Sequence, residues 1–166
     1  MLATVWRMLR NSHDAEDALH TALAVLWEQW ALVERHANPH AMILKICADA
    51  AIDHLRRRQV RARHEQIDRA FDAAFDRAVE LVPSRQRLPP DEAIGHETMD
   101  QIMAAIARLP DHQSVAVAMR FVQGASYARI AAALGCSEAT VGTHIARGRE
   151  KLGELLRHLD PNPIQE

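Results

Sequence analysis

The sequence has few aromatic residues, few cysteines and no long apolar run. Aromatic residues make up 4% of the 166 residues, whereas hydrophobic residues overall make up 48%. Many of these are Ala and Leu, which favour helices over sheets, so we expect an all-α protein. No apolar stretch approaches the length of a membrane span, and the opening residues MLATVWRMLRN lack a signal-peptide pattern. We therefore expect a protein that stays in the cytoplasm.

The sequence also offers little for catalysis or metal binding. Cys47 and Cys136 lie far apart within helical patterns, which indicates small apolar side chains rather than a disulfide or a metal site. His36 and His40 are four residues apart, but Pro39 interrupts the helix that would align them. We expect no metal, no cofactor and no enzymatic activity.

The net charge of -2 conceals an uneven distribution. Residues 53–63 carry five arginines against one aspartate, residues 64–111 are mainly acidic, and residues 112–166 are nearly balanced. The arginines of the basic run are Arg56, Arg57, Arg58, Arg61 and Arg63. Cations stabilise the C-terminal end of a helix, but five in so short a run exceed what capping needs. The run therefore predicts contact with nucleic acid.

Residues 126–152 have the pattern of a helix-turn-helix. Gly135 suits the left-handed position that ends a first helix, and Ser137 can cap a second one. Apolar residues at helical spacing form one seam between the two helices: Ile130, Ala131, Leu134, Val141, Ile145, Gly148 and Leu152. Such a pair holds its second helix out towards a DNA major groove.

The outer face of the second helix offers hydrogen-bonding groups first and cations afterwards, an order suited to bases and then phosphates. We predict that the DNA-binding residues here are Ser137, Thr140, Thr143, His144, Arg147 and Arg149. The alternative is an ordinary helical hairpin with a solvated basic face.

The first part of the chain predicts amphipathic helices. One covers residues 2–10, and a second covers about 15–32, capped by Ser12 or Asp14. The apolar stripe of the second helix is expected to be Leu19, Leu23, Leu26, Trp27 and Trp30. The ordinary interpretation of the two tryptophans is packing in the core.

A third helix is expected to begin at Asn38 and Pro39 and to run into the arginines. A helical pattern continues over 64–82, and the proline-containing residues 83–95 mark a domain boundary that leaves the two halves free to separate. Further helices are expected over 96–109 and 111–122, with a frayed tail from 159. The predicted units are a first domain over 1–63, a linker over 64–95 and a second domain over 96–166.

The order of these features resembles the extracytoplasmic-function (ECF) group of bacterial RNA polymerase sigma factors. Residues 14–27, DAEDALHTALAVLW, are similar to the family's polymerase-docking helix, and residues 43–58, ILKICADAAIDHLRRR, to its promoter-opening segment. IARLP at 106–110 followed by the helix-turn-helix is similar to the segment that reads the more distant promoter element.

The resemblance implies a promoter-specificity subunit that binds core RNA polymerase and promoter DNA and initiates transcription, as a monomer when free. The first domain would dock on the clamp helices of the largest polymerase subunit, and Arg56 to Arg61 would grip the separated strand. The implied polymerase-binding residues are Asp14, Glu16, Asp17, His20 and Trp27. An anti-sigma factor is a further partner to which the resemblance points.

The sequence departs from the family pattern at several positions. They are His20 and Thr21 in place of a Gln-acid pair, Met42 and Leu44 in place of aromatics, Asp49 in place of Asn, and Gly142 and His144 in place of Lys and Arg. Two alternatives remain open. One is a LuxR-type regulator, since TVGTHIARGREKL also resembles that family's recognition helix. The other is a degenerate sigma-like protein that acts through protein contacts.

Overall fold

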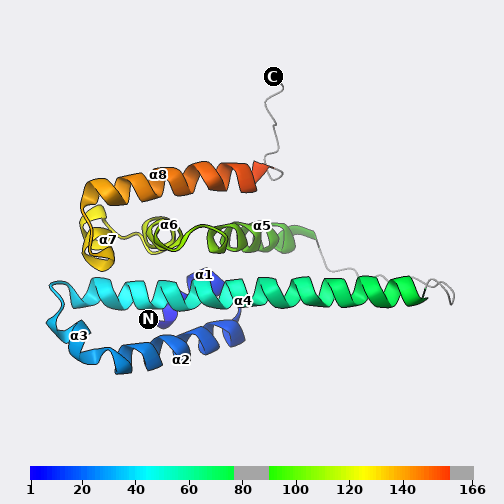
Figure 1. Cartoon of the computed structure of the whole chain (residues 1–166), viewed down its shortest axis with the longest axis horizontal. Helices are drawn as coiled ribbons and strands as arrows, with labels where there is room; N and C mark the ends of the chain where they lie inside the picture. Colours follow the sequence, from blue (N-terminus) through cyan, green and yellow to red (C-terminus); the bar gives the residue numbers. More distant parts are fainter. Residues whose placement is uncertain (77–89, 158–166) are drawn as a thin grey trace, which may run out of the picture.

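A computed structural model describes residues 1–76 and 90–157, with side chains over 1–66 and 98–157. The regular elements in these ranges are helices, which confirms the all-α prediction (Figure 1). The first half holds α1 (Leu2–Leu9), α2 (Ser12–Glu28), α3 (Trp30–Arg35) and α4 (Pro39–Asp76). The second half holds α5 (Pro90–Ala107), α6 (Asp111–Val117), the π-helical turn η1 (Ala118–Val122), α7 (Tyr127–Leu134) and α8 (Glu138–Leu155). None of the described helices has the length and apolar character that a bilayer crossing needs.

The long helix α4 forms the middle layer of the molecule. Helices α1 and α2 pack on it from the first half, and α5, α6 and α7 pack on it from the second (Figure 1). Helix α8 forms the outer layer beyond α6. Buried residues of both halves belong to one hydrophobic cluster. The two halves are thus in contact in this structure, whereas the sequence predicted that a linker would leave them free to separate.

Helix α2 begins one residue after a cap that the sequence analysis did not choose. The Asn11 side chain accepts hydrogen bonds from the backbone N–H groups of His13 and Asp14, at 3.0 and 3.2 Å. The prediction of Ser12 or Asp14 as the cap was therefore wrong, although Asn is an equally favourable capping residue. The sequence predicted one helix over 15–32, but the structure has two, because the helix is interrupted at Gln29 between α2 and α3.

The buried face of α2 is made of alanines. Ala15, Ala18 and Ala22 are almost completely buried, and their small side chains let α2 lie close to α4. Trp27 is 85% exposed and Trp30 is 54% exposed. The prediction that both tryptophans pack in the core was therefore wrong, because the alanine line, and not the line of large residues, faces α4.

Helix α4 begins at Pro39, where the Asn38 side chain accepts the N–H of Ala41 at 3.0 Å. This start was predicted. The helix then runs without interruption across the predicted domain end at residue 63. Helix α5 begins at Pro90 and not near residue 96, because proline is also well tolerated in the first turn there. Residues 77–89 and 158–166, which include the end of the predicted 64–82 helix and the predicted tail, lie outside the described residues.

The helix-turn-helix is confirmed. Gly135 ends α7 in the left-handed conformation at φ 64°, and the Ser137 side chain accepts the N–H of Thr140 at 3.1 Å. Ile130, Val141 and Ile145 are buried between the two helices. Both cysteines are free thiols, Cys47 in the core and Cys136 in the turn after α7 rather than within a helix.

Gly148 permits the close approach of α8 to α6. A Cβ at this position would lie 2.7 Å from Val117 Cγ2 and within ordinary contact distance of Leu109 and Gln113. Real Cβ atoms essentially never come so close, so any other residue would push the two helices apart. The glycine thus fixes the position of the helix that carries the predicted DNA-reading residues.

Candidate nucleic-acid and polymerase interfaces

The outer face of α8 presents most of the side chains predicted to bind DNA. Thr140, Thr143, Arg147 and Arg149 are exposed, and the part of the chain that the structure describes provides no ion pair for either arginine. The Thr143 hydroxyl donates to the Ala139 carbonyl at 3.1 Å and keeps its acceptor capacity. This face can therefore accept or donate hydrogen bonds near its start and supply positive charge further along.

Ser137 has a structural role at the same helix end. Its hydroxyl oxygen caps α8 through the Thr140 N–H and lies 2.8 Å from the Thr140 hydroxyl. Ser137 thereby orders the start of the recognition helix and orients Thr140.

His144 lies between the outer face of α8 and helix α6. Its ring meets the edge of the His112 ring, with centroids 5.5 Å apart and planes at 83°. Burial lowers the pKa of His144, and positive charge on His112 and Arg147 lowers it further. At neutral pH the imidazole is therefore uncharged, and it offers one donor and one acceptor to a base rather than a cation to a phosphate.

The predicted arginine run is divided by the structure into engaged and exposed members. Arg57, Arg61 and Arg63 are exposed to solvent. Arg56 is instead half-buried and contacts Asp111 and two backbone carbonyls of the second half. Arg58 is also exposed, but it pairs with Asp14 of α2 and lies near Asp100 of α5. The sequence showed the charge of all five but could not show which were occupied.

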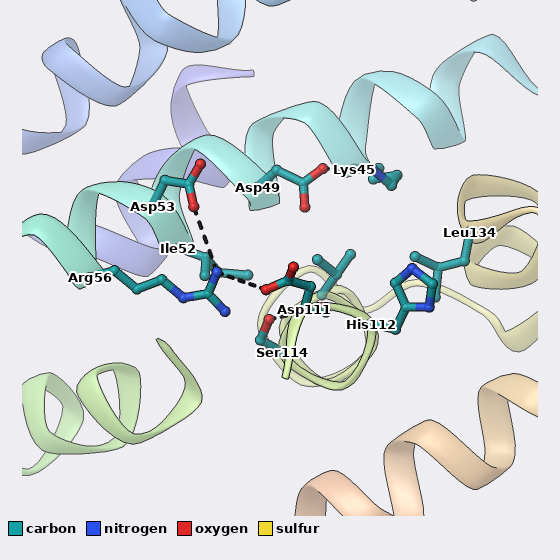
Figure 2. A pocket seen from close by; sticks show the side chains of 10 residues that line it. Lys45, Asp49, Ile52, Asp53, Arg56, Asp111, His112, Ser114 and Leu134 are labelled. Carbon is teal, nitrogen blue, oxygen red and sulfur yellow. Dashed lines mark hydrogen bonds and ion pairs between the residues drawn. The ribbon is translucent and has the colours of Figure 1, made fainter. Parts of the chain in front are cut away.

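Arg56 uses all three of its guanidinium nitrogens in contacts with the second half. Nε donates to the Ala107 carbonyl at 2.8 Å, Nη2 to the Leu109 carbonyl at 3.0 Å and Nη1 to Asp111 at 2.9 Å. Figure 2 shows the side chain reaching from α4 to Asp111, with Asp53 of its own helix on the other side at 3.7 Å. An open cavity of about 370 Å³ adjoins these groups.

Arg58 and Asp14 hold α2 against α4. Asp14 accepts from His54 at 3.1 Å and from Arg58 at 3.3 Å, and its side chain is only 21% exposed. Arg58 also lies 3.8 Å from Asp100 of α5. Asp14, which the resemblance assigned to polymerase binding, thus already forms ion pairs with residues of its own protein.

Asp49, where the family has Asn, forms an ion pair with Lys45 at 2.7 Å. Lys45 lies one turn before Asp49 on the same helix, so the pair offsets this negative charge. Burial raises the pKa of Asp49, while Lys45 opposes the shift and Asp53 and Asp111 add to it. The folded protein therefore binds this proton more tightly than the unfolded chain, and stability falls as pH rises from the usual aspartate range through the raised pKa.

We expect Asp49→Asn to unfold at a higher temperature than the wild type at pH 7, because the variant no longer buries a charged carboxylate. The difference should shrink as pH falls towards the usual aspartate range, where Asp49 becomes protonated. Thermal unfolding followed by circular dichroism between pH 4 and 7 measures this, with the exposed Asp17→Asn as control. If the wild type is instead more stable than Asp49→Asn at pH 7, the ion pair with Lys45 stabilises the protein by more than the burial of the charged carboxylate costs.

Helix α2 carries an exposed stripe at helical spacing: Glu16, His20, Leu23 and Trp27. Leu23 is 43% exposed, and together with Trp27 and Trp30 it borders an apolar hollow of about 700 Å³ at the corner between α2 and α3. Asp17 lies beside the stripe, 3.5 Å from His13. Leu23 and Trp30 were not predicted as surface residues; the alanine spacing at 15, 18 and 22 was the signal that could have identified them. Soluble monomers rarely expose such apolar patches without a partner.

Comparison with known proteins agrees with this arrangement. Residues 1–61 match the model of Sigma-70 region 2, and residues 99–152 match the model of Sigma-70, region 4, so the two matches together cover more than half of the chain. The ECF RNA polymerase sigma factor SigX of Bacillus subtilis is 29% identical over 153 residues, which are 90% of this chain and 76% of the relative. SigW of the same organism is 26% identical over 159 residues, 93% of this chain and 81% of the relative.

A solved structure of the sigma factor RpoE in complex with the anti-sigma factor NepR from Bartonella quintana also aligns with the chain, with 20% identity, 94% and 89% coverage of the two chains and a TM-score of 0.47. Neither the LuxR-type alternative nor the degenerate sigma-like alternative finds support, because both sigma regions are matched in order and the full-length relatives are sigma factors. Sigma factors are transcription initiation factors that bind core RNA polymerase and promoter DNA. The chain belongs to the ECF group of RNA polymerase sigma factors.

Proposed function

We propose that this sigma factor uses three surfaces, one for polymerase binding, one for binding the separated promoter strand and one for reading the more distant promoter element. The exposed stripe of α2, with Trp30, binds the clamp helices of core RNA polymerase. The arginine run of α4 grips the promoter strand separated near the start site, and the outer face of α8 reads the more distant promoter element. On this proposal residues 1–63 and 96–166 are the working domains, and residues 64–95 join them.

The observation that carries the polymerase contact is the exposure of Trp27 on the helix that resembles the family's docking helix, and of Trp30 at the start of the next helix, α3. Trp27 is 85% exposed in a patch that also contains Leu23 and Trp30. Tryptophans are enriched among residues that dominate protein interfaces. Glu16, Asp17 and His20 surround this apolar area with polar groups, which is the usual anatomy of an interface core and rim.

The DNA-reading surface follows from the order of groups along α8. Thr140 and Thr143 are exposed in the first turns of α8, which the Ser137 cap orders. Recognition helices contact base edges with residues near their N-terminal ends. Arg147 and Arg149 follow and supply charge for phosphates.

We expect Arg147→Ala to weaken binding to all duplex sequences and to reduce the salt dependence of log K by about one, because one phosphate contact is lost. Thr143→Ala should instead change the preferred sequence and leave the salt slope unchanged. Binding of a randomised duplex library at several salt concentrations measures both quantities. Equal changes of both quantities in both variants would contradict this division of roles.

The experiment that tests the proposal as a whole is capture of core RNA polymerase by the purified, tagged chain. A stoichiometric complex with one copy of the chain, active in transcription from selected promoters, is the expected result. A dimer that binds duplex DNA without polymerase would overturn the proposal. The chain would act in the cytoplasm, where core polymerase is found, and would carry out no bond chemistry itself.

A further inference from the structure

His112 and His144 meet where helix α6 packs on the recognition helix α8. Their rings lie edge to face, with centroids 5.5 Å apart and planes at 83°. Aromatic rings favour this arrangement, because the positive edge of one ring meets the negative face of the other. The contact joins a residue outside the recognition helix to one of the residues predicted to bind DNA.

The packing of α6 on α8 holds the two rings at this distance. Gly148 lies one turn after His144 on the same face of α8 and lets it approach Val117 and Gln113 of α6 closely. Gln113 follows His112 directly in α6. The histidine pair therefore lies beside a tightly packed helix contact, where neither backbone can shift far.

The contact leaves part of the His144 ring accessible. His144 is half-buried, and its position on α8 is one turn after Thr140, on the same side of the helix. The hydroxyl of Thr140 is itself held by the Ser137 hydroxyl, at 2.8 Å. Two neighbouring polar groups of the base-reading face are thus both oriented by other residues, Thr140 by Ser137 and His144 by His112.

The surroundings of His144 keep its imidazole uncharged at neutral pH. Burial lowers the pKa of His144, and positive charge on His112 of α6 and on Arg147 of α8 lowers it further. From α7, the apolar Leu134 lies beside His112, which is turned away from Arg56 (Figure 2).

The carboxylates that line the cavity beside His112 are paired with cations. Asp111 and Asp53 lie 2.9 and 3.7 Å from Arg56, and Asp49 lies 2.7 Å from Lys45. The histidine pair stands apart from these ion pairs, so the charge of His144 is set mainly by its burial and by its two cationic neighbours.

Protonation changes what His144 offers to a base. A neutral imidazole has one donor and one acceptor, which complement the N7 and the amino group of adenine. A charged imidazole has two donors and no acceptor, so it no longer accepts from an amino group and instead suits the two acceptors of guanine or a phosphate. The two charge states therefore favour different sequences.

We propose that His112 is a positioning residue for promoter reading, which holds the uncharged His144 ring at the base-reading face of α8 and thereby makes sequence preference depend on pH. The inference rests on the proposed role of α8. Above the usual histidine range, His144 selects its base through a donor and an acceptor. As pH falls and both rings become charged, they repel each other, and the preference is lost.

The first readout is binding of a randomised duplex library to the full-length chain between pH 5 and 8. At pH 8, His144→Ala should lower the discrimination at one base pair about fivefold, and His112→Ala about threefold at the same base pair. His112→Phe should keep the wild-type preference at pH 8, because a phenyl ring makes the same edge-to-face contact.

The second readout is titration of the histidine rings by nitrogen-15 NMR without DNA. His112→Phe should raise the pKa of His144, because one of the charges that oppose its protonation is removed. The pH at which the sequence preference is lost should rise with it. His13→Phe is the matched control, since His13 is an exposed histidine of α2 and its replacement should alter neither readout.

A double variant tests whether His112 acts through His144. In a His144→Ala background, His112→Ala should cause no further loss of preference, and an equal loss in both backgrounds would overturn the proposal. So would an unchanged titration of His144 in His112→Phe. The titration needs no DNA, so it is distinguishable from failure of the proposed function, which would appear as a wild-type chain without any sequence preference.

Discussion

Replacing Trp27 by alanine is expected to lower the affinity for core RNA polymerase by more than tenfold and to leave thermal stability nearly unchanged. The indole is 85% exposed, so its removal costs the folded chain little buried area. In an interface the same side chain would be covered, and loss of a central tryptophan typically costs about 2 kcal/mol or more. Titration of labelled polymerase measures the first quantity, and circular dichroism measures the second.

Trp6→Ala is the appropriate comparison for Trp27→Ala. Trp6 is a tryptophan of α1 that is 50% exposed, but it lies outside the hollow between α2 and α3. Its replacement should therefore leave polymerase affinity close to the wild-type value. If Trp27→Ala and Trp6→Ala bind polymerase equally well, the α2 stripe is not the docking surface.

Gly148→Val is expected to destabilise the protein by about 3 kcal/mol, because the new side chain must enter a packed contact. A Cβ alone would stand 2.7 Å from a methyl group of Val117, which is itself buried and stiff. The melting temperature should fall by roughly 10 °C. DNA binding by α8 should weaken as well, because α6 and α8 can no longer approach to their native distance.

The matched control for Gly148→Val is Gly153→Val in the same helix. A Cβ at Gly153 meets nothing within 4 Å, and valine forms helices slightly better than glycine, so the change should be neutral or weakly stabilising. A comparable loss of stability in both variants would show that helix propensity, and not contact with α6, decides the effect at Gly148.

The helix-turn-helix could be predicted because its determinants are local. Gly135 and Ser137 act within a few residues of their own positions, through a left-handed turn and a side-chain cap. Helical spacing alone also predicted the burial of Ile130, Val141 and Ile145, but it wrongly placed Gly148 in the same seam, because Gly148 packs against α6. The start of α4 was predictable for the same reason, since Asn38 and Pro39 determine it by themselves.

The exposed face of α2 was missed, although the alanine spacing at 15, 18 and 22 was a signal for the opposite, buried face. The hydrophobicity of a residue shows that its burial is favourable, but not whether the core of the same protein or a partner protein buries it. Trp27 and Trp30 were assigned to the core on their size, whereas Ala15, Ala18 and Ala22 actually face α4. The choice between the two faces depends on how closely the neighbouring helix approaches.

The sequence by itself determined the helical class, the helix-turn-helix and the position of the basic run, because caps, periodicity and charge act over a few residues. Only the tertiary structure decided that Arg56 caps the end of α5, since its partners lie more than fifty residues away along the chain. It also decided that Gly148 lies against α6, so that the residue permits helix packing as well as lowering the helix propensity of α8. Both outcomes arise from the approach of helices distant in sequence, which depends on the packing of the whole core.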